Sequence, residues 1–166
     1  MFVSTSAIGQ DSHRFESDGS RKPLVLGGVT IQGCPGLSGN SDADVILHAL
    51  TNAVSGISGV NILGKISDDL CIKQGITDSR AYLEKALETL AVDKWELTHV
   101  SISVEAKRPH LSSYIEGIKR SIASMVNLPE KSIGLTATTG EGLTAFGRGE
   151  GIQAFVIVSA VRETAS

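Results

Sequence analysis

The sequence contains few aromatic residues and few cysteines. Only 4% of its 166 residues are aromatic, and its two cysteines, Cys34 and Cys71, lie far apart without a Cys-x-x-Cys spacing. Neither a disulfide framework nor a zinc site made of thiolates is therefore indicated. Two isolated cysteines are typical of a protein from a reducing compartment, which we expect to be the cytoplasm.

An excess of one charge and long apolar runs are also missing. The formal net charge is -3, which gives no broad attraction to a phosphate polymer, so we expect no nucleic acid as a partner. No window approaches the roughly 20 apolar residues that a membrane-spanning helix requires, so we expect no membrane span. Residues 1–10 lack a basic region followed by an apolar run, and no targeting peptide is expected.

What is present is the composition of an ordinary globular chain. Hydrophobic residues make up 41% and charged residues 20% of the sequence, and a length of 166 residues is enough for one continuous core. No repeat and no Pro- or Ser-rich linker divides the chain. We therefore expect a single domain over residues 1–166.

Strands and helices alternate in the expected secondary structure. The first helix is predicted to begin at Ser41, which precedes Asp44 in a capping-box spacing, and residues 56–76 read as an irregular connection. The order predicts an α+β fold, a four-stranded sheet with helices on one face in a ferredoxin-like sandwich. Strands are expected over 2–9, 95–105, 132–138 and 152–161, a hairpin over 23–31 turning at Gly27-Gly28, and helices over 41–55, 78–90 and 112–126.

Three side chains form a candidate metal site. Asp11 and His13 are two residues apart in an extended segment and therefore lie on the same side of the chain, and His48 lies on the predicted helix. Three such ligands leave an open position, as in a catalytic zinc site. Asp44, four residues before His48, is predicted to orient its imidazole. The alternative is a chance Asp-x-His pair and a histidine buried in the core.

Two further segments could bind an anion. Asn40-Ser41 precedes the predicted helix, where free backbone N–H groups bind phosphate oxygens, although a plain helix cap explains the same residues. The loop over 139–151 is dense in glycine, so its backbone can approach a ligand closely. In it Thr139 can donate to a phosphate, Glu141 can hold a divalent cation and Arg148 can clamp an anion. The alternative is a flexible hairpin.

The motifs that carry these residues occur in a distinctive order. They are Asp11-x-His13, Ser41-Asp42-x-Asp44-x3-His48-Ala49-Leu50, Asp78-Ser79-Arg80, Arg108-Pro109, and Thr138-Thr139-x-Glu141 with Gly147-Arg148-Gly149-Glu150-Gly151. Over nearly its whole length the chain thereby resembles the 2-C-methyl-D-erythritol 2,4-cyclodiphosphate synthase family of the non-mevalonate isoprenoid pathway. The resemblance implies a metal-dependent enzyme that cyclises 4-diphosphocytidyl-2-C-methyl-D-erythritol 2-phosphate and releases CMP.

The resemblance also implies an assembly and its cofactors. Members of the family are homotrimers with active sites at the subunit boundaries, each holding Zn2+ and a second ion, Mg2+ or Mn2+. By analogy Asp11, His13 and His48 bind zinc, and Glu141 holds the second ion together with the substrate phosphates. Arg148 matches an arginine that faces the central channel of the trimer, where some members hold an isoprenoid diphosphate.

The same resemblance places the substrate. Thr139 is expected to steady the phosphates, and the methylerythritol lies near residues 62–64. The cytidine is expected beside residues 106–112 and 138–141 of the neighbouring subunit. The implied substrate-binding residues are Asp11, Ser12, His13, Asn40, Ser41, Ile62, Leu63, Gly64, Ala106, Pro109, His110, Ser112, Thr138, Thr139, Gly140, Glu141 and Arg148, with Thr139 and Asn40 as catalytic residues.

The sequence departs from the family pattern near the substrate. Asn40 replaces the usual histidine and can still donate to a phosphate oxygen, but it cannot become cationic. Ile62 stands where an acidic residue is expected to hold the erythritol hydroxyls, and Asn61 could take that place if the register slips by one. Ser67 stands for a common aromatic residue, Gly140 for Thr or Ser, and His110 for lysine.

Two other functions fit parts of the pattern. A zinc phosphohydrolase would bind water at the open metal position and cleave a CDP-linked substrate, with Asp44 as the one nearby general base. A non-catalytic module that binds CDP or an isoprenoid diphosphate is favoured only by Asn40 and Ile62.

Overall fold

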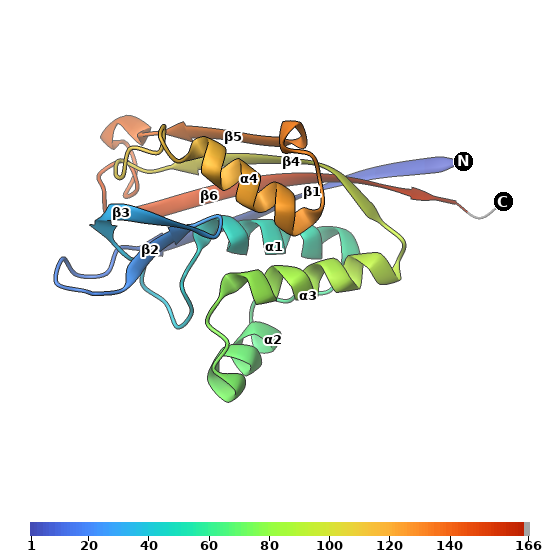
Figure 1. Cartoon of the computed structure of the whole chain (residues 1–166), viewed down its shortest axis with the longest axis horizontal. Helices are drawn as coiled ribbons and strands as arrows, with labels where there is room; N and C mark the ends of the chain where they lie inside the picture. Colours follow the sequence, from blue (N-terminus) through green and yellow to red (C-terminus); the bar gives the residue numbers. More distant parts are fainter. Residues whose placement is uncertain (165–166) are drawn as a thin grey trace.

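The computed structural model describes residues 1–164 and contains a four-stranded mixed sheet (Figure 1). Its strands are β1 (Phe2–Arg14), β6 (Gly151–Glu163), β4 (Glu96–Glu105) and β5 (Ile133–Thr138), in the order β1-β6-β4-β5. The β1/β6 and β6/β4 pairs are antiparallel, whereas β4 and β5 are parallel. The parallel pair brings the carboxyl ends of β4 and β5 to one edge, where the loops that follow them meet.

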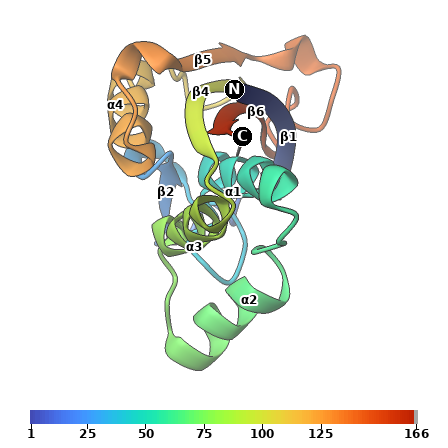
Figure 2. The ribbon, with the colours of Figure 1, turned by 90° about the vertical axis from the view of Figure 1, so that its right-hand side faces the viewer.

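The helices lie on one face of this sheet. Helix α1 (Val45–Ser58) packs on β1 and β6, and α3 (Ser79–Val92) packs on α1 from the other side. Helix α4 (Ile115–Val126) lies beside β5, and the short α2 (Lys65–Asp68) projects away with the π-helical turn Asp69–Lys73 that follows it (Figure 2). Short 3-10 turns at Glu130–Ser132 and Gly140–Gly142 flank β5. The predicted α+β fold with a four-stranded sheet is therefore confirmed.

The alternation of apolar residues along β4 explains which face is covered. Val100, Ile102 and Val104 are buried beneath the helices, as the sequence predicts, and the residues between them are exposed. The outward face of the sheet carries large apolar side chains that are exposed in the single chain, among them Ile8, Phe155 and Ile157. The register pairs Ile8 of β1 directly with Ile157 of β6. One face of the sheet thus builds the core, and the other presents an unpartnered apolar patch.

The hairpin forms where the sequence predicts it. Strands β2 (Pro23–Leu26) and β3 (Val29–Pro35) are antiparallel and joined by Gly27 and Gly28. Both glycines have positive φ, 59° and 76°, a conformation that side chains with Cβ disfavour. Within residues 1–164 the structure contains no helix of the length and apolarity that crossing a bilayer requires.

Several predicted boundaries need correction, and α4 begins at Ile115 rather than at residue 112. Strand β1 continues to Arg14 rather than ending at residue 9, so Asp11 and His13 lie inside a strand. Helix α1 begins at Val45 with Asp44 as its N-cap, because Ala43 adopts a left-handed φ of 54° and separates Ser41 from the helix. The segment 56–76 is not wholly irregular, since it contains the end of α1, α2 and the π-helical turn.

Candidate functional site

Asp11, His13 and His48 converge at one point between β1 and α1. Nε2 of His13 lies 2.8 Å from Oδ2 of Asp11, and Nδ1 of His48 lies 3.0 Å from the same oxygen. The two histidine nitrogens are 3.2 Å apart. The structure therefore brings together the three ligands that the sequence predicts, and they are the cluster of potential metal ligands found among the described residues.

Gly9 allows the helix to approach the strand this closely. A Cβ atom at Gly9 would lie 2.0 Å from the carbonyl oxygen of Ala49 and 2.3 Å from the backbone nitrogen of Ala53, so any larger residue would push α1 away. The backbone of β1 thus lies directly against α1, two residues before Asp11. This close packing places His48 beside the carboxylate.

The electrostatics of the cluster favour a bound cation. Burial opposes the charge of Asp11, but hydrogen bonds from His13 and His48 outweigh it and lower the pKa of the carboxyl to about 2. The hydrogen bond to Asp11 raises the pKa of His13 above its usual value. One carboxylate and two imidazoles, all partly buried, make a donor set that suits zinc and leaves a fourth position for a ligand.

Asp44 does not orient His48, and that prediction is wrong. Its Oδ1 accepts hydrogen bonds from the backbone of Gly27 at 2.9 Å and Leu47 at 3.0 Å, and its Oδ2 accepts one from Gly28 at 2.7 Å. The side chain therefore caps α1 and holds the β2–β3 turn. Its complete burial raises the pKa of Asp44 to about 6, because lost hydration outweighs the three N–H donors.

Ser79, a residue to which the sequence assigned no role, contacts His48 instead. Its Oγ lies 2.8 Å from Nε2 of His48, the ring nitrogen that faces away from Asp11. Ser79 follows Asp78, the N-cap of α3. The sequence signals for Ser79 are its position in the first turn of a helix and its place in the Asp78-Ser79-Arg80 motif, and nothing in the spacing indicates that α3 begins beside His48.

A pocket opens beside the metal cluster. Its volume is about 140 Å³, and Asn40, Ser41 and Leu63 line it together with His13 and His48. Because α1 begins at Val45, Asn40 and Ser41 lie before the helix and not at its positive end, so the predicted anion site at a helix N-terminus is not formed there.

Three other residues that the resemblance implies for substrate binding, Ser12, Ile62 and Gly64, differ in their exposure to solvent. Ile62 is buried in the core, and its side chain faces other apolar residues. Ser12 is exposed, because in β1 it points to the face opposite Asp11 and His13. Gly64 begins α2 with a φ of 114°.

A second pocket lies at the carboxyl ends of β4 and β5. It has a volume of about 210 Å³ and shares no lining residue with the pocket at the metal cluster. The hydroxyls of Thr138 and Thr139 accept the backbone N–H groups of Gly140 and Glu141, which leaves each hydroxyl hydrogen to be donated. The predicted residues that line this pocket are Ala106, Pro109, His110, Ser112, Thr138 and Thr139.

Gly140, Glu141 and Arg148 follow this pocket in the glycine-dense loop. A Cβ atom at Gly140 would lie 2.0 Å from Oε1 of Glu105, so a larger residue would require the Glu105 side chain to move, and the positive φ of 69° at this position also favours glycine. Glu141 is exposed and has a left-handed φ of 49°. Arg148 donates from Nε to Glu150 at 3.0 Å. Glu141 and Arg148 are therefore not part of the cluster formed by Asp11, His13 and His48.

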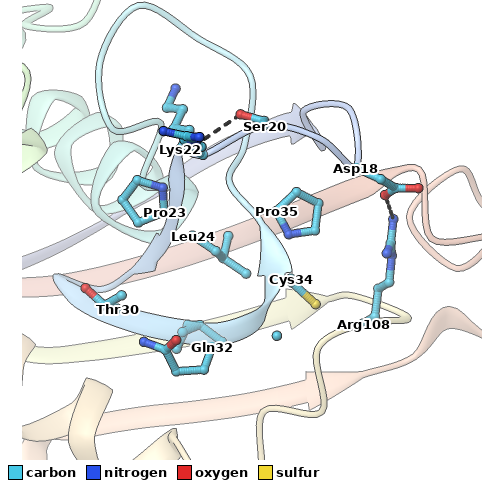
Figure 3. Close-up of a pocket in the computed structure, with 13 residues that line it drawn as sticks. Asp18, Ser20, Lys22, Pro23, Leu24, Thr30, Gln32, Cys34, Pro35 and Arg108 are labelled. Atoms are coloured by element: carbon cyan, nitrogen blue, oxygen red, sulfur yellow. Dashed lines mark hydrogen bonds and ion pairs between the residues drawn. The ribbon is translucent and has the colours of Figure 1, made fainter.

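A third hollow lies along the β2–β3 hairpin (Figure 3). Two of its basic side chains are already engaged. Nζ of Lys22 donates to the carbonyl of Gly39 at 2.9 Å, and the guanidinium of Arg108 lies 4.8 Å from the ring centroid of Phe15 and 3.9 Å from Asp18. The hollow contains none of the candidate metal ligands.

Comparison with known proteins gives a consistent result. The model of the YgbB family matches residues 5–161. A 2-C-methyl-D-erythritol 2,4-cyclodiphosphate synthase of Chlamydia caviae is 44% identical over 152 residues, which are 92% of this chain and 86% of that protein. The similarity thus spans nearly the whole sequence, including all three metal-ligand candidates.

Solved structures share the fold. The bifunctional IspDF from Campylobacter jejuni aligns with a TM-score of 0.88 and 32% identity over 98% of this chain, which spans only 43% of that larger protein. The CDP-bound form of a 2C-methyl-D-erythritol-2,4-cyclodiphosphate synthase aligns with a TM-score of 0.77 and 29% identity, covering 94% of this chain and 99% of the other.

Proposed function

The chain belongs to the YgbB family, and we propose that Asp11, His13 and His48 form the metal centre with which it carries out the reaction of a 2-C-methyl-D-erythritol 2,4-cyclodiphosphate synthase. This reaction cyclises 4-diphosphocytidyl-2-C-methyl-D-erythritol 2-phosphate and releases CMP, in the non-mevalonate isoprenoid pathway. The convergence of three ligands within 3.2 Å of one another is the observation that carries the proposal.

Zinc is the ion that fits these ligands best. Its open position would polarise a phosphate oxygen and neutralise the charge that develops as the diphosphate is attacked. The partial burial of the cluster strengthens this interaction relative to bulk water. Glu141, an exposed carboxylate beside Thr139, is proposed to hold Mg2+ or Mn2+ together with the substrate phosphates.

The protein side chains then position the substrate. Because the substrate's own 2-phosphate attacks the β-phosphorus, the protein needs to supply no nucleophile. It needs only to hold the two phosphates near one another. Asn40 faces the pocket at the metal cluster and would donate to a phosphate oxygen there. Thr139, which lines the second pocket, has a hydroxyl hydrogen that it could donate to the same phosphates.

We place the cytidine in the pocket lined by Ala106, Pro109, His110, Ser112, Thr138 and Thr139, and the methylerythritol beside Leu63 and Gly64. The two pockets share no lining residue within one chain. A complete active site would therefore combine the metal cluster of one subunit with the cytidine pocket of its neighbour. The remaining proposed contacts are Ser12, Ser41, Ile62 and Gly140, of which Ile62 could act only through its backbone because its side chain is buried.

A homotrimer would supply that arrangement. Ile8, Phe155 and Ile157 form an exposed apolar patch on the outward face of the sheet, and exposed patches of this kind mark protein interfaces. We propose that three sheets pack through this face around a central axis. Arg148 lies at the surface with its guanidinium beside Glu150, and in the trimer it would face the central channel and bind an isoprenoid diphosphate.

The protein is proposed to act in the cytoplasm as a single domain. Both cysteines are free, which suits a reducing compartment. A hydrolytic function receives no support, because Asp44, its one candidate general base, is fully buried and its oxygens accept three backbone hydrogen bonds.

Product analysis tests the reaction directly. The purified protein is incubated with zinc, magnesium and the CDP-linked substrate, and the products are identified by mass spectrometry and phosphorus NMR. We expect CMP together with the cyclic diphosphate. A linear monophosphate, or binding of the substrate without CMP release, would contradict the proposal.

A further inference from the structure

A chain of hydrogen bonds reaches the imidazole of His48 at Nε2, the ring nitrogen that faces away from Asp11. Oγ of Ser79 lies 2.8 Å from Nε2 of His48, and the same hydroxyl donates to Oδ1 of Asp42. Ser79 is fully buried, and His48 is nearly so. The hydrogen bonds therefore run from Asp42 through Ser79 to His48, which belongs to the metal cluster. We call this chain of three residues the relay.

The chemistry of these groups fixes the direction of every hydrogen bond. An ionised carboxylate can only accept, so the hydrogen of the Ser79 hydroxyl must point to Asp42. The oxygen of Ser79 then offers only lone pairs to His48, and Nε2 must be the nitrogen that carries the hydrogen. Because Nε2 keeps its hydrogen, Nδ1, which faces Asp11 and His13, is the nitrogen with which His48 would bind a metal ion, in place of its hydrogen bond to the Asp11 carboxylate.

Asp42 is itself held in place by the backbone of two elements. Its Oδ2 accepts the N–H of Ser79 at 3.1 Å, and its Oδ1 accepts the N–H of Asp44 at 3.1 Å. Its own N–H donates to the carbonyl of Thr77 at 2.9 Å. The carboxylate thereby joins the segment before α1 to the first turn of α3, so its position relative to His48 is set by the packing of the two helices.

We propose that Asp42 and Ser79 are positioning residues that fix the tautomer and the orientation of His48 so that Nδ1 is presented to the metal. This inference rests on the proposed metal centre, and it assigns to Ser79 and Asp42 the role that spacing alone had suggested for Asp44. Carboxylates that hold metal-bound histidines through their second nitrogen raise the basicity of the ligand and fix the ring. Here a serine hydroxyl lies between the carboxylate and the ring.

Zinc affinity is the first test, because it can be measured without substrate. Ser79→Ala removes the hydroxyl but keeps the backbone N–H that donates to Asp42. We expect the zinc dissociation constant, measured by competition with a chromophoric chelator, to rise about 10- to 100-fold. The matched control is Ser55→Ala, which removes another buried serine hydroxyl, on the same helix as His48 and without a hydrogen-bond partner among the described residues. Its zinc affinity should equal that of the unaltered protein.

The imidazole hydrogen provides a second readout that a purely structural role would not change. In the zinc-loaded protein the Nε2 hydrogen of His48, bonded to a buried hydroxyl, should exchange slowly with water and give a separate proton NMR signal. Ser79→Ala should make it exchange fast. Asp42→Asn should also weaken zinc binding, because its amide NH2 can donate to Ser79 and turn the hydroxyl hydrogen toward His48.

The outcomes separate this inference from the proposed metal centre. If the unaltered protein binds no zinc, the metal centre is wrong and the relay with it. If the unaltered protein binds zinc and both Ser79→Ala and Asp42→Asn bind it equally well, the relay alone is overturned. Equal weakening in Ser55→Ala would likewise overturn it, since a general effect on α1 would then explain the loss. A fast-exchanging Nε2 hydrogen in the unaltered zinc-loaded protein contradicts the relay even if the variants fail to fold.

Discussion

At the scale of single residues, His48 connects the metal cluster to the core. Its Nδ1 lies against Asp11, its Nε2 lies against Ser79, and its backbone belongs to a helix that is buried along most of its length. Removing the side chain takes away a ligand, but it leaves the apolar contacts of α1 in place. Loss of metal and loss of fold should therefore be separable at this position.

His48→Ala should lose zinc and nearly all activity while keeping its fold. The remaining two ligands leave zinc without the three protein groups that a catalytic site requires. Zinc content by elemental analysis and helical content by circular dichroism measure the two effects independently. Zinc at the stoichiometry of the unaltered protein would show that His48 is not a ligand.

Zinc affinity should depend on pH through His13. Its hydrogen bond to Asp11 raises its pKa above the ordinary value of 6.5, so in the metal-free protein the imidazolium contributes stability at low pH that is lost as the pH rises through the folded pKa. Zinc requires the neutral ring and must displace this proton. Affinity should fall about tenfold per pH unit below the pKa of His13, since one proton is released for each zinc ion bound.

Chelator competition across about pH 6 to 8, where histidine titrates, measures this dependence. Asp11 should add no slope in the same range, because its pKa of about 2 keeps it ionised throughout. A constant zinc affinity over the whole range would mean that His13 does not give up a proton to the metal.

At the scale of helices and strands, Asp44 joins α1 to the β2–β3 turn. Both of its carboxylate oxygens accept backbone N–H groups in a buried site, so an amide in its place would turn an NH2 group toward at least one N–H donor. The consequence should appear in stability, with little change in metal binding.

Asp44→Asn should lower the free energy of unfolding by about 1 to 3 kcal/mol, the usual cost of leaving a buried donor unsatisfied. Urea unfolding of the metal-free variant and of the unaltered protein measures the difference. Zinc affinity of the folded variant should match that of the unaltered protein. A stable variant with weakened zinc binding would instead indicate that Asp44 orients His48, and would contradict the assignment of that role to Ser79 and Asp42.

The elements also show what the sequence could and could not predict. The pattern of Val100, Ile102 and Val104 identified β4 and its buried face, because alternation is a local property of a strand. The start of α1 was misplaced because Ala43 adopts a left-handed conformation that its residue type does not announce. The contact between Ser79 and His48 depends on how α1 and α3 pack, which no spacing within either helix contains.

At the scale of the whole molecule, one chain presents two pockets that share no residue. Asp11, His13 and His48 could be predicted from spacing as one site, whereas the role of the Thr138–Thr139 segment could be predicted only by resemblance, since its pocket lies elsewhere on the chain. The outward face of the sheet, with Ile8, Phe155 and Ile157, is the surface through which we propose that three chains meet.

Ile157→Lys should dissociate the proposed trimer, because a charged side chain at the centre of an apolar interface would be desolvated without a partner. We expect analytical ultracentrifugation to give the mass of three chains for the unaltered protein and of one chain for the variant, with activity lost alongside. Ile72→Lys is the matched control, since Ile72 is exposed on the π-helical turn, away from the sheet. A fully active unaltered monomer would contradict an active site shared between subunits.

The most direct test of the metal centre and its reaction is a zinc titration of the metal-free protein. Zinc is removed with a chelator and returned in steps in the presence of magnesium and the CDP-linked substrate, while CMP and the cyclic diphosphate are quantified. The account predicts that both products appear in equal amounts, that their rate rises with zinc until each chain holds one ion, and that His48→Ala gives neither. Equal turnover without zinc would contradict the account, as would CMP release without the cyclic product.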